Sequence, residues 1–123
     1  MDTQVVILAG GLGERLRPLT ASIPKPLVPV AGRPFLDHLL DLLQRQRVQR
    51  VLLLTGYLGE QIAEHVGDGR KWHMQISCMR EPEPLGTGGA LRHALPALDA
   101  EFLLLNGDTY LDCDYAEIGR AHV

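Results

Sequence analysis

Three loops of this sequence combine glycine with charged side chains, and each follows a short apolar run. The first loop contains Gly10, Gly11 and Gly13 and ends at Arg15. Glycine lets backbone N–H groups approach a phosphate closely, and an arginine guanidinium presents a planar fork of donors to phosphate oxygens. The first loop therefore indicates a phosphate-binding site, with a plain glycine turn as the alternative.

Two common phosphate-binding motifs do not account for the first loop. The spacing of its glycines lacks the third glycine of a dinucleotide-binding fingerprint, because Leu16 stands at that position. The lysine and hydroxyl residue that complete a P-loop do not follow either.

A lysine comes after the first loop, between two prolines. Lys25 lies between Pro24 and Pro26, and each proline restricts both itself and the residue before it, which predicts that this segment is not helical. A rigid backbone suits a lysine that must point at one place. A surface lysine in an extended proline-rich loop is the alternative.

The second loop, residues 81–89, joins rigid prolines to a run of glycines. It begins at Glu81 and leads into a predicted helix, and helix N-termini favour anions. This loop predicts further contacts to a ligand, with an ordinary connection from strand to helix as the alternative.

The third loop is Asn106-Gly107-Asp108. An Asn-Gly pair is also a strong hairpin signal. However, the preceding run, residues 102–105, is wholly apolar rather than alternating, which favours a buried parallel strand. Asp108 would then lie beyond the carboxyl end of a strand, where a carboxylate is well placed to hold Mg²⁺.

Strands and helices are predicted to alternate along the chain and to hold these loops. Continuous apolar runs indicate buried strands, and apolar residues three and four apart indicate helices. The predicted strands are residues 5–8, 51–54, 74–79 and 102–105. The predicted helices are residues 35 to about 47, 59–66 and 90–98. This order predicts an α/β fold with a mainly parallel sheet.

Composition excludes several classes of partner. The chain has 123 residues and a net charge of -3, which fits one domain and gives no general attraction to nucleic acid or to an anionic membrane. The apolar residues 5–9 are too few for a signal peptide or a membrane span, so we expect a cytoplasmic protein. Cys78 and Cys113 form no metal-ligand spacing, and Cys78 is expected to be a buried free thiol.

Taken together, the motifs resemble those of sugar-1-phosphate nucleotidylyltransferases. The matching stretches are residues 8–20, 24–27, 84–88 and 106–108. The resemblance implies a Rossmann-like three-layer α/β fold, truncated relative to the family, with residues 1–123 as the N-terminal portion of a nucleotide-binding domain. It also implies a nucleoside triphosphate and a sugar 1-phosphate as substrates, and Mg²⁺ as the cofactor.

The resemblance also implies roles for individual residues. Arg15, Lys25 and Asp108 would be catalytic, with Asp108 as the metal ligand. The residues implied in substrate binding are Leu8, Ala9, Gly10, Gly11, Gly13, Glu81, Pro84, Gly86 and Thr87. A sugar 1-phosphate is already ionised at neutral pH, since its second pKa is about 6. The reaction therefore needs alignment and charge neutralisation rather than a general base, and the five histidines need no role.

Within the family, the motifs are most similar to bacterial guanylyltransferases that act on heptose or mannose 1-phosphates. Uridylyl- and thymidylyltransferases often have glutamine where Glu81 stands, so GTP is the first choice and UTP or dTTP the alternative. Glu83 is the alternative to Glu81 for contacting the base. Family chains normally continue for about as many residues again, with the groups that hold the sugar. We therefore expect this chain alone to bind nucleotide weakly and not to turn over.

Two rival interpretations come from other classes. A molybdenum-cofactor nucleotidylyltransferase shares the Leu-Ala-Gly-Gly start but lacks the long segment between Arg15 and Lys25. A non-catalytic regulatory or assembly domain could keep the nucleotide-binding fold. No nucleic-acid or membrane partner is expected, and a homo-oligomer is left open.

Overall fold

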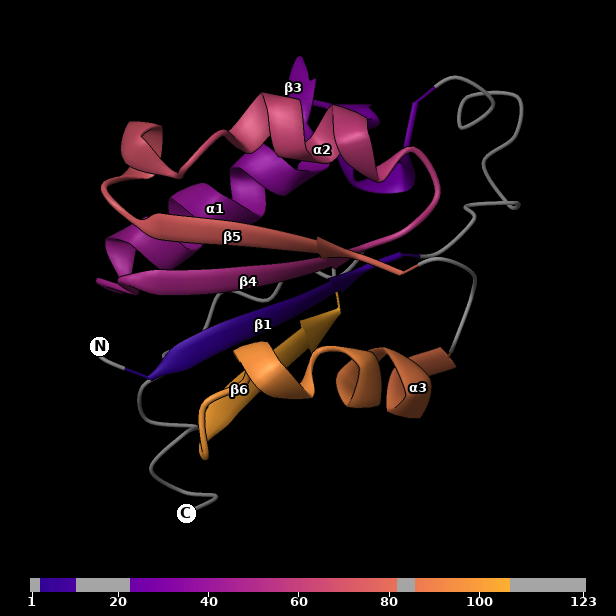
Figure 1. Ribbon diagram of the computed structural model, residues 1–123. Coiled ribbons are helices and arrows are strands. Elements are labelled where there is room, and N and C mark those ends of the chain that lie inside the picture. The colour runs from indigo at the N-terminus through magenta and orange to yellow at the C-terminus, as the bar shows by residue number, and fades with distance from the viewer. Residues whose placement is uncertain (1–2, 11–22, 82–85, 107–123) are drawn as a thin grey trace.

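A parallel four-stranded sheet forms the centre of the computed structural model, which describes residues 3–10, 23–81 and 86–106 (Figure 1). The strand order is β5-β4-β1-β6, and every neighbouring pair is parallel. The strands are β1 (Gln4–Ala9), β4 (Arg50–Thr55), β5 (Gln75–Arg80) and β6 (Phe102–Asn106). The four predicted strands and the parallel sheet are confirmed.

Helices cover both faces of the sheet, which gives the three predicted layers. Helices α1 (Phe35–Arg45) and α2 (Gly59–Val66) lie on one face, and α3 (Gly86–His93) lies on the other (Figure 1). Successive side chains of a strand point to opposite faces. Accordingly, Val5 and Ile7 of β1 pack in the hydrophobic core between the sheet and helices α1 and α2, called the α1–α2 core below. Val6 instead packs with Ala90 of α3 on the other face. The run of apolar residues from Val5 to Ala9 is explained by this burial, because both faces of β1 are covered.

The segment around Lys25 corrects one prediction. It forms a single 3₁₀ turn, η2 (Lys25–Leu27), in which Leu27 N–H donates to the Pro24 carbonyl at 2.9 Å. Proline has a backbone angle that suits the first turn of a helix, and its missing N–H is not needed there. The two prolines therefore exclude a longer helix but not one turn.

The boundaries of α3 correct a second prediction. The helix begins at Gly86, inside the segment expected to be a loop, and it ends at His93 rather than near residue 98. Pro96 cannot donate the backbone hydrogen bond that would continue an α-helix, so a separate 3₁₀ turn, η4 (Leu95–Ala97), follows. The glycines at the start of α3 made its first turn resemble a loop in the sequence.

The remaining elements lie on the α1–α2 side of the molecule. Strands β2 (Pro29–Val30) and β3 (Arg33–Pro34) form a small antiparallel hairpin before α1, and η3 (Arg70–Trp72) follows α2. Cys78 of β5 is a free, half-buried thiol against the α1–α2 core, and burial raises its pKa. Within the described residues, no helix is long and apolar enough to cross a membrane.

Candidate active site

The strand order reverses beside β1, which creates a place where ligands can bind. From β1 the chain adds β4 and then β5 on one side, and β6 then pairs with the other side of β1. The intervening helices lie on opposite faces of the sheet for the two sides (Figure 1). Open α/β sheets bind ligands beyond the carboxyl ends of the strands at such a point. The first loop follows the carboxyl end of β1, and the third loop follows the carboxyl end of β6, so both start at this point of the sheet.

Glu81 lies directly against the backbone of Gly10. A Cβ atom placed on Gly10 would come within 2.6 Å of the Glu81 Oε1 atom, which is closer than real Cβ contacts allow. The absent side chain of Gly10 therefore makes room for the carboxylate. The structure thus brings together Gly10 of the first loop and Glu81 of the second loop, which the sequence could only place on separate loops.

The end of β4 supports both of these residues. Glu81 N–H donates to the Thr55 carbonyl at 2.7 Å. A Cβ atom on Gly56 would lie 3.0 Å from the Gly10 carbonyl oxygen and 3.3 Å from its Cα atom, so the two loop backbones pass very close to each other. Sequence reasoning gave Gly56 no role. The signal was present, because a glycine follows buried strand β4 just as Gly10 follows β1.

Leu8 and Ala9, which were predicted to bind substrate, belong to β1. Ala9 is buried in the α1–α2 core, and the half-buried Leu8 packs against the core on the α3 side. The side chain of Ala9 is therefore part of the core, and a ligand could reach this residue only at its backbone. Leu8 pairs in register with Asn106 of β6, which brings the starts of the first and third loops to neighbouring strands.

Lys25 is carried by a segment with several anchors. Pro24 and Pro26, on either side of it, are buried, and Leu27 packs against the α1–α2 core. Further along the segment, Phe35 N–H donates to the Val28 carbonyl at 3.0 Å. Lys25 itself is half-buried in this turn.

The β2–β3 hairpin that follows Lys25 is tied to α1 by charged and polar side chains. His38 Nε2 lies 2.6 Å from the Val30 carbonyl oxygen, and the Arg33 guanidinium donates to Asp41 at 2.6 Å. Trp72 Nε1–H also donates to Asp41, at 2.9 Å. Burial acts to raise the pKa of Asp41, but the hydrogen bonds from Arg33 and Trp72 outweigh burial and lower it. This ionised carboxylate therefore joins the hairpin, α1 and η3.

The structure describes only some of the other predicted site residues. Gly86 and Thr87 form the first turn of α3. Among the described residues, no group of three or more His, Cys, Asp and Glu side chains could hold a metal ion. Five predicted residues lie outside the described part of the chain, namely Gly11, Gly13, Arg15, Pro84 and Asp108.

Comparison with known proteins identifies the family. The model of the nucleotidyl transferase family matches residues 4–123, so this chain belongs to that family, as its motifs predicted. Nucleotidyltransferases of this family generally use a divalent metal ion.

Named relatives include both guanylyl- and uridylyltransferases. The chain is 39% identical over 115 residues to D-glycero-alpha-D-manno-heptose 1-phosphate guanylyltransferase of Campylobacter jejuni, covering 94% of this chain and 52% of that protein. It is 40% identical over 116 residues to N-acetylmuramate alpha-1-phosphate uridylyltransferase of Neisseria meningitidis, covering 91% and 49%. The chain therefore spans about half the length of these curated relatives.

A solved structure extends the likeness to three dimensions. HddC from Yersinia pseudotuberculosis, crystallised in complex with GMP-PN, superposes with a TM-score of 0.86 at 40% sequence identity. The match covers 98% of this chain and 54% of HddC. The predicted Rossmann-like α/β fold is confirmed by this likeness and by the layers described above.

Proposed function

We propose that this chain provides the nucleotide-binding portion of a sugar-1-phosphate nucleotidylyltransferase, over residues 1–123. The reaction joins a nucleoside triphosphate and a sugar 1-phosphate into an NDP-sugar and releases pyrophosphate. The contact between the Glu81 carboxylate and the bare Gly10 backbone, at the carboxyl ends of β5 and β1 and beside the switch point of the sheet, carries this proposal. A flat base could lie along the glycine backbone with its polar edge toward Glu81. We place the reaction in the cytoplasm, where its nucleoside triphosphate substrate is available.

The chemistry of Glu81 favours guanine as the base. An ionised carboxylate only accepts hydrogen bonds, and guanine offers two adjacent donors, N1–H and the 2-amino group. Charge-assisted pairs of this kind are the stronger ones. Uracil and thymine offer one donor between two carbonyl oxygens, which a carboxylate would repel. We propose GTP with a heptose or mannose 1-phosphate, and the heptose 1-phosphate guanylyltransferase relative and the GMP-PN complex of HddC support the guanine nucleotide and the heptose.

A uridylyl- or thymidylyltransferase is the second candidate. The observation that favours it is the 40% identity to the uridylyltransferase of Neisseria meningitidis, which is as high as the identity to HddC. Glu83, the alternative base contact, lies outside the described residues.

The reaction itself requires little from the protein beyond placement and charge. An oxygen of the sugar phosphate forms a bond to the α-phosphorus as the bond from that phosphorus to the pyrophosphate oxygen breaks. We assign Arg15 and Lys25 to neutralising the phosphate charges. Asp108 follows Asn106 of β6 by two residues, and its carboxylate would hold Mg²⁺. That ion would neutralise the charge of the bound phosphates.

Pyrophosphate release tests the proposed reaction. The full-length protein is incubated with Mg²⁺, one of GTP, UTP or dTTP, and a panel of hexose and heptose 1-phosphates. We expect release that depends on both substrates and is fastest with GTP. Nucleotide binding without release for any pair would instead support a non-catalytic nucleotide-binding module.

Substitution of Glu81 tests the assignment of the base. Glu81→Gln in the full-length protein is expected to lower the preference for GTP over UTP by about 10–150-fold in kcat/KM, because an amide can pair with uracil and offers guanine one acceptor fewer. Steady-state rates with the two nucleotides measure the ratio. A wild-type preference for UTP, or a ratio that does not change, would contradict this assignment.

Gly10→Ala provides a matched variant for the same measurement. The added methyl would displace the Glu81 carboxylate, which is a flexible side-chain end, so base preference should fall without unfolding the protein. In the Glu81→Gln background the same substitution should change the preference much less, because the two changes act on one contact.

A further inference from the structure

One peptide unit at the end of β5 is held at both of its polar ends. This unit joins Arg80 to Glu81. Its N–H donates to the Thr55 carbonyl of β4 at 2.7 Å, and its carbonyl oxygen lies 3.3 Å from His93 Nε2 of α3. In a planar trans peptide the N–H and the carbonyl point in opposite directions. The two hydrogen bonds therefore fix the orientation of the plane from which the Glu81 side chain leaves.

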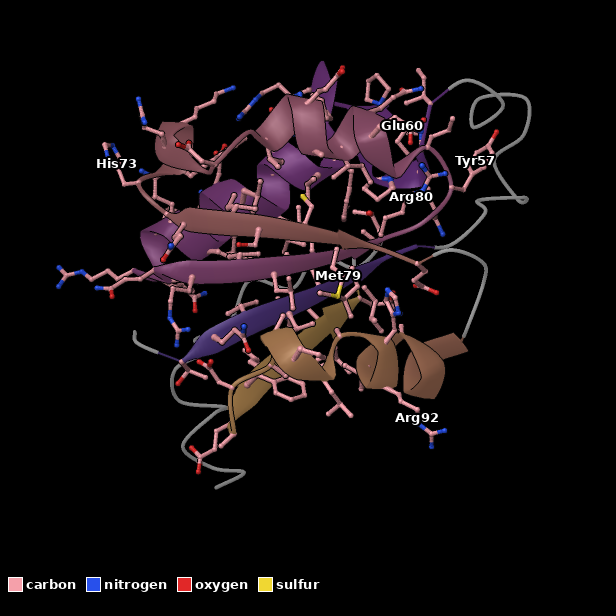
Figure 2. The ribbon with its side chains drawn as sticks, in the orientation of Figure 1. Tyr57, Glu60, His73, Met79, Arg80 and Arg92 are labelled. Carbon is pink, nitrogen blue, oxygen red and sulfur yellow. The ribbon has the colours of Figure 1, made fainter. Side chains whose placement is uncertain are left out.

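The two neighbouring layers hold this strand end from opposite sides. The Arg80 side chain turns toward α2, where its Nη1 atom lies 3.1 Å from Glu60 Oε2 (Figure 2). His93 approaches the backbone of the same residue from the last turn of α3, on the other face of the sheet. The contact also ties the end of α3 back to the start of the second loop.

We propose that His93 is a positioning residue for base recognition, because it holds the peptide unit that directs Glu81 against Gly10. This inference rests on the proposed role of Glu81. A site that reads hydrogen bonds must keep its groups within about 0.5 Å of the productive geometry. Without its donor, the Arg80–Glu81 peptide keeps one of two anchors and can tilt. The carboxylate then no longer meets both guanine donors in one plane.

Comparison of GTP with ITP tests this role. Inosine keeps N1–H and lacks the 2-amino group, so the GTP-to-ITP ratio of kcat/KM in the full-length protein reports the second hydrogen bond of the carboxylate. His93→Ala is expected to lower this ratio by about 2–10-fold, the usual effect of losing one hydrogen bond. Because it is a ratio, a smaller fraction of folded enzyme does not change it.

Three variants control the experiment. His93→Gln keeps an N–H donor at a similar reach, and it should retain most of the wild-type ratio. Arg92→Ala changes the preceding exposed side chain of α3, which points away from the sheet (Figure 2), and should leave the ratio unchanged. Glu81→Gln should lower the ratio directly.

The outcomes separate this inference from the proposed function. An unchanged ratio in His93→Ala, with a lowered ratio in Glu81→Gln, would overturn the role of His93 alone. An unchanged ratio in both variants would overturn base recognition by Glu81, and the inference with it. A ratio that falls equally in His93→Ala and His93→Gln would also overturn it, since the donor would then be irrelevant.

Discussion

The Asp108→Asn variant of the full-length protein is expected to lose turnover, with a fall in kcat on the order of 10³-fold. The substitution keeps the size of the side chain and removes the negative charge that we assign to holding Mg²⁺. The register of the sheet supports this assignment. Asn106 ends β6 beside Leu8 of β1, so the residues that follow each strand start from the same edge.

Two measurements make this prediction specific to the metal. The dependence of nucleotide binding on Mg²⁺ concentration should weaken in Asp108→Asn, while circular dichroism shows an unchanged fold. Glu101→Gln is the matched control, because it removes an exposed carboxylate just before the opposite end of β6. Normal turnover of Asp108→Asn at the same Mg²⁺ concentration would assign Asp108 a structural role instead.

Arg15→Ala is expected to lower kcat by about 10²–10³-fold, as the loss of one preorganised charged donor typically does. In the sequence Arg15 ends the glycine-containing loop that starts at Gly10, and we assign its guanidinium to the negative charge that grows on the departing pyrophosphate. The effect should appear mainly in kcat, because this charge develops in the transition state.

Lys25→Ala is the companion to the arginine variant and should lower kcat in the same direction, to an equal or smaller extent. Its turn is anchored by Pro24, Pro26 and Leu27, so removal of the amine should leave the backbone in place. Steady-state kinetics with the preferred nucleotide separates kcat from KM for both variants, with Arg92→Ala as the surface control. If kcat is unchanged in Arg15→Ala, the arginine does not stabilise the leaving group.

Local sequence was sufficient for most of the architecture. A strand that is buried on both faces is apolar throughout, and both residues 5–8 and residues 51–54 consist only of apolar residues. The helix predicted from Phe35 is amphipathic, and its buried face is the leucine face, with Leu36, Leu39, Leu40 and Leu43. The errors at η2 and α3 arose where proline and glycine were judged by average preference. A single 3₁₀ turn accommodates the prolines, and tertiary packing accommodates the glycines.

The sequence by itself determined which chemical groups the site could use: a glycine loop, a lysine between prolines, and carboxylates after strand ends. Only the tertiary structure decided which of these groups meet. Periodicity predicts a strand but not its neighbours, and here the order β5-β4-β1-β6 brings the ends of β1, β4 and β5 together. The contact of Glu81 with Gly10 and the close approach of Gly56 to Gly10 follow from that order. Each joins residues far apart in the chain, so no local pattern of residues contains it.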